Sequence, residues 1–291
     1  MNNILLNKKL SFMEDKLLCP FDGGTVIYKK DFVKCLKCNN IFSVKDDKIF
    51  FINPPDNIEE NTKSDIYEKW SVWRKLNFDF FKKEISKISV KGNLLDIGAG
   101  PTQFRNIFVD FERYVGIDFY PYSFVKVVTD LNKKIPYQND VFNVVILSNV
   151  LEHISNSESL LKESFRVLKR NSKILATIPF LMRIHQAPYD FNRFTIYKLK
   201  EIFENAGFSN VIIEPQGNPY EVLEIKFGHF LQYAIGNVYY KNDIINYFFI
   251  IFLKITGKIL FFFLRFIGIA LKKIKSNNDF TIGYSVSAIK K

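Results

Sequence analysis

The stretch NLLDIGAGPTQFRNIFVDFERYVGID, residues 93–118, decides the fold class. It opens with an apolar run that predicts a strand buried on both faces, and Gly98 and Gly100 then allow a sharp turn close to a ligand. A second apolar run ends at Asp118, which follows Asp96 by 22 residues. Nucleotide-binding folds place a carboxylate against the ribose hydroxyls at about this spacing. The stretch therefore predicts an α/β domain that binds a nucleotide.

Five apolar runs alternate with helical or loop segments, which predicts right-handed crossovers and a parallel sheet. They cover residues 94–97, 114–117, 125–128, 141–147 and 174–178. Ligands of such sheets bind beyond the carboxyl ends of the strands, so we expect the residues there to converge on one crevice. The candidate cofactor-binding residues are Asp96, Gly98, Ala99, Gly100, Asp118, Phe119, Asp130, Leu131, Ser148 and Asn149.

The glycine turn differs from a dinucleotide fingerprint, because Pro101 and Thr102 follow where a third small residue is expected. Four further segments carry a family likeness: VTDL (128–131), VFNVVILSNVLEHI (141–154), RVLKR (166–170) and TIPF (177–180). In their order and spacing these segments resemble the class I S-adenosylmethionine-dependent methyltransferases of the type 11-like group. The resemblance covers about half of the chain.

This resemblance implies a Rossmann-like, seven-stranded methyltransferase sheet, mostly parallel with an antiparallel last strand, and S-adenosylmethionine as the cofactor. It also implies that Asp96 holds the methionine portion, Asp118 the ribose and Asp130 the adenine amino group. Methyl transfer from a sulfonium needs in-line approach of a nucleophile at about 3 Å, and a base when the nucleophile is a hydroxyl. A candidate base is therefore expected near the strand ends.

Two histidines follow strands that end at the expected crevice. His153 lies in NVLEHI, and His185 lies in PFLMRIHQAPYDFNRFT together with Asp190 and Arg193. We predict that His185 is the general base, that Asp190 orients it or contacts the acceptor, and that Arg193 contacts an anion; His153 is a further catalytic candidate. The alternatives are a backbone-bonded histidine at a helix start for His153 and a polar loop that closes the sheet edge for His185.

Residues 1–53 resemble a zinc ribbon, in which two knuckles of ligands grip one Zn²⁺ and replace a hydrophobic core. The second knuckle is Cys35 and Cys38, whereas the first has Cys19 and, in place of a second thiolate, Asp22. A Cys₃Asp zinc site and a metal-free ribbon that packs against the larger domain both remain open. Residues 54–90 predict a polar linker and a helix over 65–89 that covers the cofactor.

The segment 244–271 is nearly all apolar and contains seven Phe. Its three basic residues, Lys254, Lys258 and Arg265, fall on a narrow stripe of a helix together with Lys272, which follows the segment. The longest uncharged run has ten residues, against the roughly 20 that a membrane span needs. We therefore predict a helix that lies on anionic lipids, while a spanning or re-entrant helix and a buried hairpin stay open. Gly257 and Gly268 could divide it into two helices.

The expected domain order is a core over 91–220, an apolar helical insertion over 221–279 and a final strand over 280–291. The net charge of +11 is concentrated near the carboxyl end, because residues 241–291 hold nine Lys or Arg against two Asp. This position disfavours nucleic acid as the partner. Three cysteines without a secretory leader favour the reducing cytoplasm, with the chain peripherally or monotopically attached to a membrane.

The loop that contains His185 resembles one that recurs in methyltransferases of bacterial surface polysaccharide synthesis. With the apolar helix, this resemblance implies a methyltransferase that acts on a hydroxyl of a small-molecule or lipid-linked glycan of cell-surface polysaccharide synthesis. An RNA methyltransferase is the first alternative, and a non-catalytic membrane protein that binds the cofactor is the second. The methyl acceptor and the oligomeric state stay open at this point.

Overall fold

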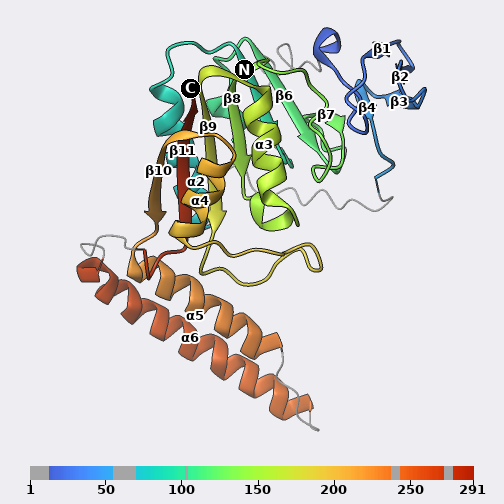
Figure 1. The fold of residues 1–291 in the computed structure, drawn as a ribbon. Coiled ribbons are helices and arrows are strands. Elements are labelled where there is room, and N and C mark those ends of the chain that lie inside the picture. The colour runs from blue at the N-terminus through green and yellow to red at the C-terminus, as the bar shows by residue number, and fades with distance from the viewer. Residues whose placement is uncertain (1–12, 55–69, 102–103, 237–242, 272–277) are drawn as a thin grey trace.

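The structure is a computed structural model that describes residues 13–54, 70–101, 104–236, 243–271 and 278–291. Its strands form one mixed sheet in the order β1-β2-β3-β4-β7-β6-β5-β8-β9-β11-β10 (Figure 1). The core strands are β5 (Asn93–Ile97), β6 (Arg113–Asp118), β7 (Val125–Val128), β8 (Phe142–Ser148), β9 (Leu168–Pro179), β10 (Ser209–Gln216) and β11 (Gly283–Lys290). The amino-terminal strands are β1 (Val26–Tyr28), β2 (Phe32–Cys35), β3 (Ile41–Lys45) and β4 (Lys48–Phe50).

The sheet therefore has eleven described strands, and the prediction of seven was wrong in this respect. The pairs β5–β6, β6–β7, β5–β8 and β8–β9 are parallel, and β11 lies antiparallel between β9 and β10. The four additional strands come from the amino-terminal module. Its last strand, β4, pairs in parallel with β7 through Ile49 and Phe50, so the module extends the sheet.

Helices cover both faces of the sheet. Side chains of successive strand residues point to opposite faces, so neighbouring residues of β5 contact different helices. Leu95 and Ile97 belong to a core cluster with residues of α3 (Ser157–Val167) and α4 (Ile196–Asn205). Leu94 belongs to a second cluster with residues of α2 (Val72–Ser86). The short 3-10 turns are η1 (Glu14–Lys16), η3 (Arg105–Ile107) and η4 (Leu151–His153).

Helix α2 is shorter than the expected 65–89, and residues 65–69 lie outside the described part of the chain. The helix begins after Ser71, whose hydroxyl accepts a hydrogen bond from the amide of Arg74 at 3.3 Å. It ends at Ser86, followed by Lys87 as the C-cap. A side-chain cap thus sets the start of α2, whereas the apolar spacing alone extends further.

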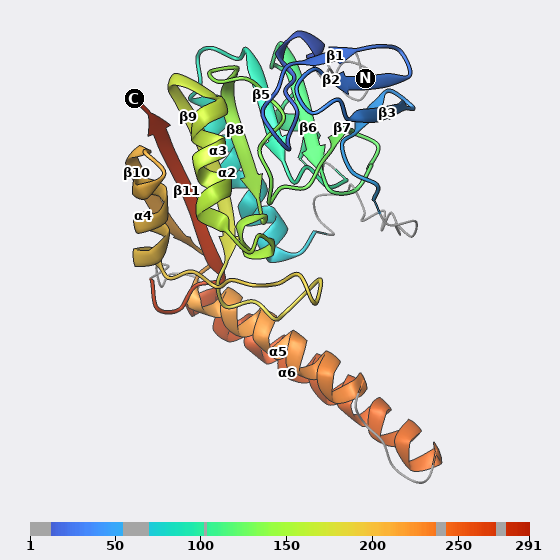
Figure 2. The ribbon, with the colours of Figure 1, turned by 45° about the vertical axis from the view of Figure 1, so that its right-hand side comes forward.

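Helices α5 (Pro219–Gly236) and α6 (Asp243–Leu271) pair as a hairpin that projects from one end of the sheet (Figures 1 and 2). Helix α6 runs without a break through Gly257 and Gly268, so the suggested division into two helices was wrong. At Gly257 a Cβ would lie 2.8 Å from the Leu231 side chain, which shows how closely the helices approach.

The hairpin exposes many apolar side chains, including Phe248, Phe252, Phe262 and Tyr233 at 56–69%. The side chains of the expected basic stripe, from Lys254 to Lys272, lie outside the described part of the structure. Within the described ranges, no helix combines the length and apolar character that crossing a membrane requires.

Candidate functional site

The turn after β5 has the geometry that its glycines were expected to provide. Gly98 and Gly100 have φ values of +66° and +55°, in the left-handed region. A Cβ on Gly98 would lie 2.5 Å from a methyl carbon of Val150, whereas a Cβ on Gly100 would have no atom within 4 Å. The first glycine is thus required by packing, and the second faces open space where a ligand fits. Ala99 lies between them and donates its amide to the carbonyl of Ile117 at 3.2 Å.

Asp96 lies one residue before the end of β5 and Asp118 is the last residue of β6, and both are buried. Asp118 accepts hydrogen bonds from the amides of Gly100 at 2.8 Å and Tyr120 at 2.9 Å, which ties the turn to β6. Asp96 accepts one from the hydroxyl of Tyr114 at 2.7 Å. Burial raises the pKa of Asp96 to about 7, with the Tyr114 bond acting against it, and burial also raises the pKa of Asp118.

Asn149 directly follows β8, the third strand of the crevice, and has a positive φ of 55°. Its side-chain oxygen accepts hydrogen bonds from the Trp73 indole at 3.1 Å and from the Asn77 amide at 3.5 Å, both on α2. The sequence did not predict these contacts, because the partners are 76 and 72 residues apart. Helix α2 therefore contacts the crevice through polar groups.

The remaining cofactor candidates lie near the carboxyl ends of β6, β7 and β8. Ser148 is the last residue of β8, and Phe119 follows β6 with 38% of its surface exposed. Asp130 accepts the amide of Asn132 at 2.9 Å, and Leu131 is buried beside it in the main core. The structure thus places all ten candidates at one edge of the sheet.

His153 and His185 lie on either side of a buried carboxylate, Glu152, which was not among the predicted site residues. Oε1 of Glu152 lies 3.7 Å from Nε2 of His153 and 4.0 Å from Nε2 of His185. The loop over 180–195 is held there by backbone bonds from the amides of Phe191 and Asn192 to the Glu152 carbonyl, at 2.8 and 3.2 Å. Burial raises the pKa of Glu152 to about 8 and lowers the pKa of His153.

Asp190 and Arg193 support His185 from the same loop. Asp190 accepts the His185 amide at 2.9 Å, and its Oδ2 lies 3.3 Å from His185 Nδ1. Arg193 donates to both Asp190 oxygens, at 2.6 and 2.8 Å, and holds the pKa of that carboxyl well below its usual range. Arg193 also donates to the Arg183 carbonyl at 3.2 Å, so it braces the loop; its role as an anion contact stays a prediction.

The four candidate ligands of the ribbon module also lie together. Sγ of Cys19 is 3.9 Å from Sγ of Cys38, and Sγ of Cys35 is 3.5 Å from Oδ1 of Asp22. Tetrahedral zinc with bonds of about 2.3 Å to sulfur holds its ligand atoms about 3.8 Å apart. The amides of Lys37 and Cys38 donate to Sγ of Cys35 at 3.4 Å. This donor set fits a zinc ion.

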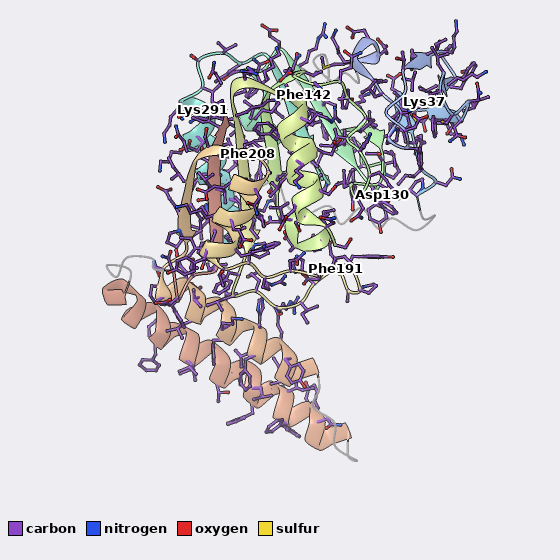
Figure 3. All side chains as sticks on the ribbon, viewed as in Figure 1. Lys37, Asp130, Phe142, Phe191, Phe208 and Lys291 are labelled. Atoms are coloured by element: carbon purple, nitrogen blue, oxygen red, sulfur yellow. The ribbon has the colours of Figure 1, made fainter. Side chains whose placement is uncertain are left out.

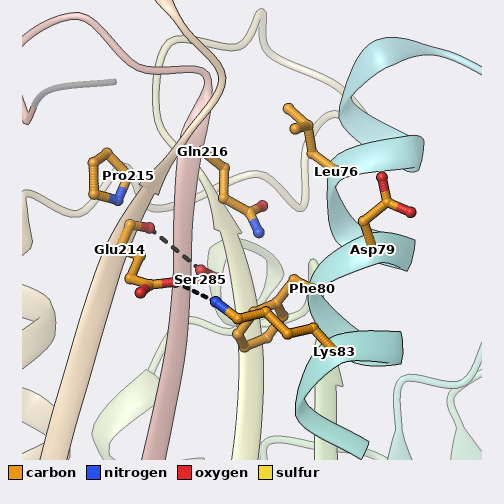
Figure 4. A pocket seen from close by; sticks show the side chains of 8 residues that line it. All are labelled: Leu76, Asp79, Phe80, Lys83, Glu214, Pro215, Gln216 and Ser285. Atoms are coloured by element: carbon orange, nitrogen blue, oxygen red, sulfur yellow. Dashed lines mark hydrogen bonds and ion pairs between the residues drawn. The ribbon is translucent and has the colours of Figure 1, made fainter. Parts of the chain in front are cut away.

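The ribbon ligands are far from the histidine loop. Figure 3 shows Lys37, next to Cys38, well away from Phe191 of the loop. A separate shallow pocket lies between α2 and the β10–β11 edge, where an ion pair joins Lys83 and Glu214 at 3.7 Å (Figure 4). Its lining residues are Leu76, Asp79, Phe80, Lys83, Glu214, Pro215, Gln216 and Ser285, and they include none of the predicted site residues.

Comparison with known proteins identifies the core. A family model described as a methyltransferase domain matches residues 70–212. An uncharacterized protein of Methanocaldococcus jannaschii is 26% identical over 165 residues, which cover 50% of this chain and 79% of that protein.

Two solved methyltransferase structures are similar to this chain. One, from Archaeoglobus fulgidus, has 17% identity and a TM-score of 0.47, covering 75% of this chain and 94% of the other. The other, phosphoethanolamine N-methyltransferase 2 of Haemonchus contortus bound to S-adenosyl-L-methionine, has 16% identity and a TM-score of 0.45, covering 74% and 52%. This chain thus spans about half the length of the Haemonchus protein.

The family match covers the glycine turn, the two aspartates and the histidine loop together. Residues 70–212 are therefore a methyltransferase domain, and the match supports the class I S-adenosylmethionine-dependent methyltransferase that the sequence predicted. The chain is an enzyme of this class, and S-adenosylmethionine is its cofactor.

Proposed function

We propose that this enzyme methylates a hydroxyl of a surface-glycan or lipid-linked precursor at a membrane surface. The observation that carries the proposal is a geometric one. The histidine loop follows β9, and the apolar α5–α6 hairpin leaves the sheet at the end of β10 and returns at the start of β11, where Gly283 pairs with Pro179 of β9. The proposed base and the hairpin are therefore at the same edge of the sheet.

The proposed reaction needs a base but no covalent enzyme intermediate. The hydroxyl oxygen attacks the methyl carbon of the sulfonium, the C–S bond breaks with its electron pair on sulfur, and S-adenosylhomocysteine leaves as a neutral thioether. The hydroxyl proton passes to Nε2 of His185, whose Nδ1 faces Asp190 at 3.3 Å. Asp190 orients the ring, and Arg193 holds Asp190 in place.

Exposed apolar side chains on the hairpin support a membrane partner. Phe248, Phe252, Phe262 and Phe263 of α6 are 56–65% exposed, and Phe230 of α5 is 63% exposed. Large apolar patches of this kind mark interaction surfaces, and an acyl layer accepts Phe side chains without pairing any polar group. Basic residues interspersed along α6 would then contact anionic headgroups.

An RNA methyltransferase is the second candidate, favoured by the ribbon module and the net charge of +11. It requires salt-sensitive RNA binding that persists without residues 221–279, since that binding depends on phosphate contacts. A third candidate is a protein that binds the cofactor without catalysis, for which no methyl acceptor would be found in any cell extract.

The decisive experiment incubates the purified enzyme with radiolabelled S-adenosylmethionine and fractionated extract. Label in glycan or lipid supports the proposal, and label in RNA or protein contradicts it. His185→Ala should lower turnover at least about 10²-fold with cofactor affinity retained, because it removes the base without touching the glycine turn. Unchanged turnover in this variant would remove His185 from the mechanism.

We further propose that the ribbon module holds one zinc ion through Cys19, Asp22, Cys35 and Cys38. Support comes from the ligand spacing and from the short strands β1–β4, which have few residues with which to build a core of their own. The zinc would stabilise the module and would take no part in methyl transfer, because the histidine loop is remote from it.

A further inference from the structure

Three side chains that can offer lone pairs to a metal ion lie together beside the crevice. Glu152 and His153 lie in η4, directly after β8, and His185 approaches from the 180–195 loop. One ligand atom from each of the three residues lies within 4.8 Å of the other two. The two imidazole rings are 4.8 Å apart at their centroids and meet edge to face at 79°.

Glu152 lacks the partners that a buried carboxylate needs. Its side chain is fully buried, and within the described part of the structure neither of its oxygens has a hydrogen-bond partner. The guanidinium of Arg193, which interacts with Glu152 electrostatically, donates its two short hydrogen bonds to Asp190 instead. Buried carboxylates are stabilised by paired donors or by coordinated cations, and the donors are absent from the described surroundings.

The Nδ1 atoms of both rings already lie beside oxygen atoms of the protein. Nδ1 of His153 lies 2.6 Å from the carbonyl of Tyr189. Nδ1 of His185 lies 3.3 Å from the Arg183 carbonyl and 3.3 Å from Oδ2 of Asp190. Because these oxygens can only accept, each Nδ1 carries the proton and each Nε2 presents a lone pair. Metal-binding histidines have this arrangement, with a carboxylate or carbonyl behind the ring.

Two imidazole lone pairs and an unpartnered carboxylate thus face one another. We propose that Glu152, His153 and His185 bind a divalent first-row transition-metal ion, with open coordination positions toward the crevice. Two histidines and one carboxylate form a known ligand set for such ions, and ligand atoms about 2.1 Å from a metal are separated by about 3.0–3.4 Å. The observed distances from Glu152, 3.7 Å to His153 and 4.0 Å to His185, require small inward shifts of both imidazole rings.

This site deepens the proposed function and, in one respect, rests on it. If the acceptor is a hydroxyl, coordination at an open position would lower its pKa, so that the proton leaves more readily. His185 would then act as a ligand rather than as the free base. Metal binding itself depends on the three side chains and not on the identity of the acceptor.

Manganese is the probe, because Mn²⁺ prefers nitrogen and oxygen ligands and leaves the thiolates of the ribbon free. The chelator-treated full chain is titrated with MnCl₂, and free Mn²⁺ is followed by electron paramagnetic resonance. We expect one saturable site in the wild type. Glu152→Gln and His185→Ala should each raise the dissociation constant at least about 10-fold.

His229→Ala is the matched control, since this histidine lies on α5, outside the cluster, and its loss should leave Mn²⁺ binding unchanged. His185 is 35% exposed at its side chain, so His185→Ala should fold even if Glu152→Gln does not. Wild-type protein without saturable binding, or equal binding by all variants, would overturn the inference.

The same material separates this inference from the proposed function. If manganese binds at the cluster but no label is transferred to glycan or lipid, the metal site is supported and the proposed methyl acceptor is wrong. If label is still transferred after chelation, in protein that binds no manganese, the metal site is wrong and His185 remains the proposed base.

Discussion

Gly98 and Gly100 share a left-handed backbone but differ in what surrounds them, and this difference yields a matched pair of substitutions. Gly98→Ala should lower the free energy of unfolding by at least about 2 kcal/mol, because the new methyl group adds a clash with Val150 to the backbone strain. Gly100→Ala should cost about 1 kcal/mol, from backbone strain alone. Urea unfolding of both variants measures the difference.

The substitution at Gly100 should also weaken binding of the cofactor. The space beside Gly100 is open, so its methyl group would enter the region where we expect the cofactor. Isothermal titration with S-adenosylmethionine should show at least about tenfold weaker binding for Gly100→Ala, or about 1.4 kcal/mol. Wild-type affinity in this variant would place the cofactor elsewhere.

Asp96 predicts a pH dependence of stability. Burial raises its folded-state pKa to about 7, above the ordinary 3.8, so the folded state binds this proton more tightly than the unfolded chain. The stabilising contribution is complete below about pH 4 and is lost as the pH rises to about 7. Asp96→Asn should remove this part of the dependence of unfolding free energy on pH.

Tyr114→Phe is the companion variant for Asp96. The Tyr114 hydroxyl donates to Asp96 at 2.7 Å and lowers its pKa, so its removal should raise that pKa and move the loss of stability to higher pH. Chemical denaturation from pH 4 to 9 in metal-free buffer checks both variants. An Asp96→Asn profile parallel to the wild type would contradict the assignment.

Sequence predicted the site residues whose function depends on local geometry. The turn at Gly98 and Gly100 is encoded within a few residues, and the structure has it there. The bonds from Trp73 to Asn149 and from Tyr114 to Asp96 depend on the packing of α2 and on the alignment of β5 with β6. Glu152 was missed for a related reason, because its burial follows from the fold and not from its neighbours in NVLEHI.

At the scale of elements, the ribbon module offers a graded test of zinc binding. Cys38→Ser should abolish stoichiometric zinc, because a hydroxyl replaces a thiolate ligand. Asp22→Cys should strengthen binding, because four thiolates complete the usual ligand set of structural zinc. Zinc content by mass spectrometry and competition with a chromophoric chelator give the order Asp22→Cys, wild type, Cys38→Ser; equal content in all three would reject the site.

The α5–α6 hairpin predicts vesicle binding that depends on exposed apolar residues. Phe252→Asp and Phe262→Asp should reduce co-sedimentation with anionic vesicles by at least about tenfold, because a carboxylate is costly in the acyl region and repels the headgroups. Both side chains are more than half exposed, so folding and cofactor binding should be retained. Tyr197→Asp, on α4 and 81% exposed, is the control and should sediment like the wild type.

The number of strands was the least predictable property of the elements. The core strands follow from apolar runs, and β11 was expected from the alternation in residues 280–291. The join between β4 and β7 is short: Ile49 pairs with Val127 and Phe50 with Val128, and the Phe51 amide donates to the Val128 carbonyl at 2.9 Å. Pairing between distant edge strands is a tertiary property, so the sequence predicts a seven-stranded sheet and a separate module.

At the scale of the whole molecule, the hairpin and the crevice share one edge of the sheet. Gln216 pairs with Gly283 where the chain leaves and re-enters the core, and Thr281 donates its hydroxyl to the Gln216 carbonyl at 2.7 Å. The loop of the histidine cluster reaches the hairpin through Arg183 and Gln232, at 3.5 Å. The reaction would therefore take place close to whatever surface the hairpin contacts.

This arrangement predicts that removal of the hairpin separates catalysis from delivery of the acceptor. A variant with residues 221–279 replaced by a short Gly-Ser linker should fold, because β10 and β11 keep their antiparallel register. It should lose about 2 kcal/mol of stability, because buried Val222 no longer packs against Trp73 and Ile282. Affinity for S-adenosylmethionine should stay within about twofold, since no cofactor candidate lies in the deleted segment.

Methyl transfer to an acceptor embedded in vesicles should fall at least about tenfold in this variant, because the local concentration of enzyme at the surface is lost. Transfer to the same acceptor in detergent, where no surface is needed, should remain close to the wild-type rate. Equal loss in vesicles and detergent would mean that the hairpin shapes the active site itself. Equal retention in both would mean that the exposed Phe side chains serve another partner.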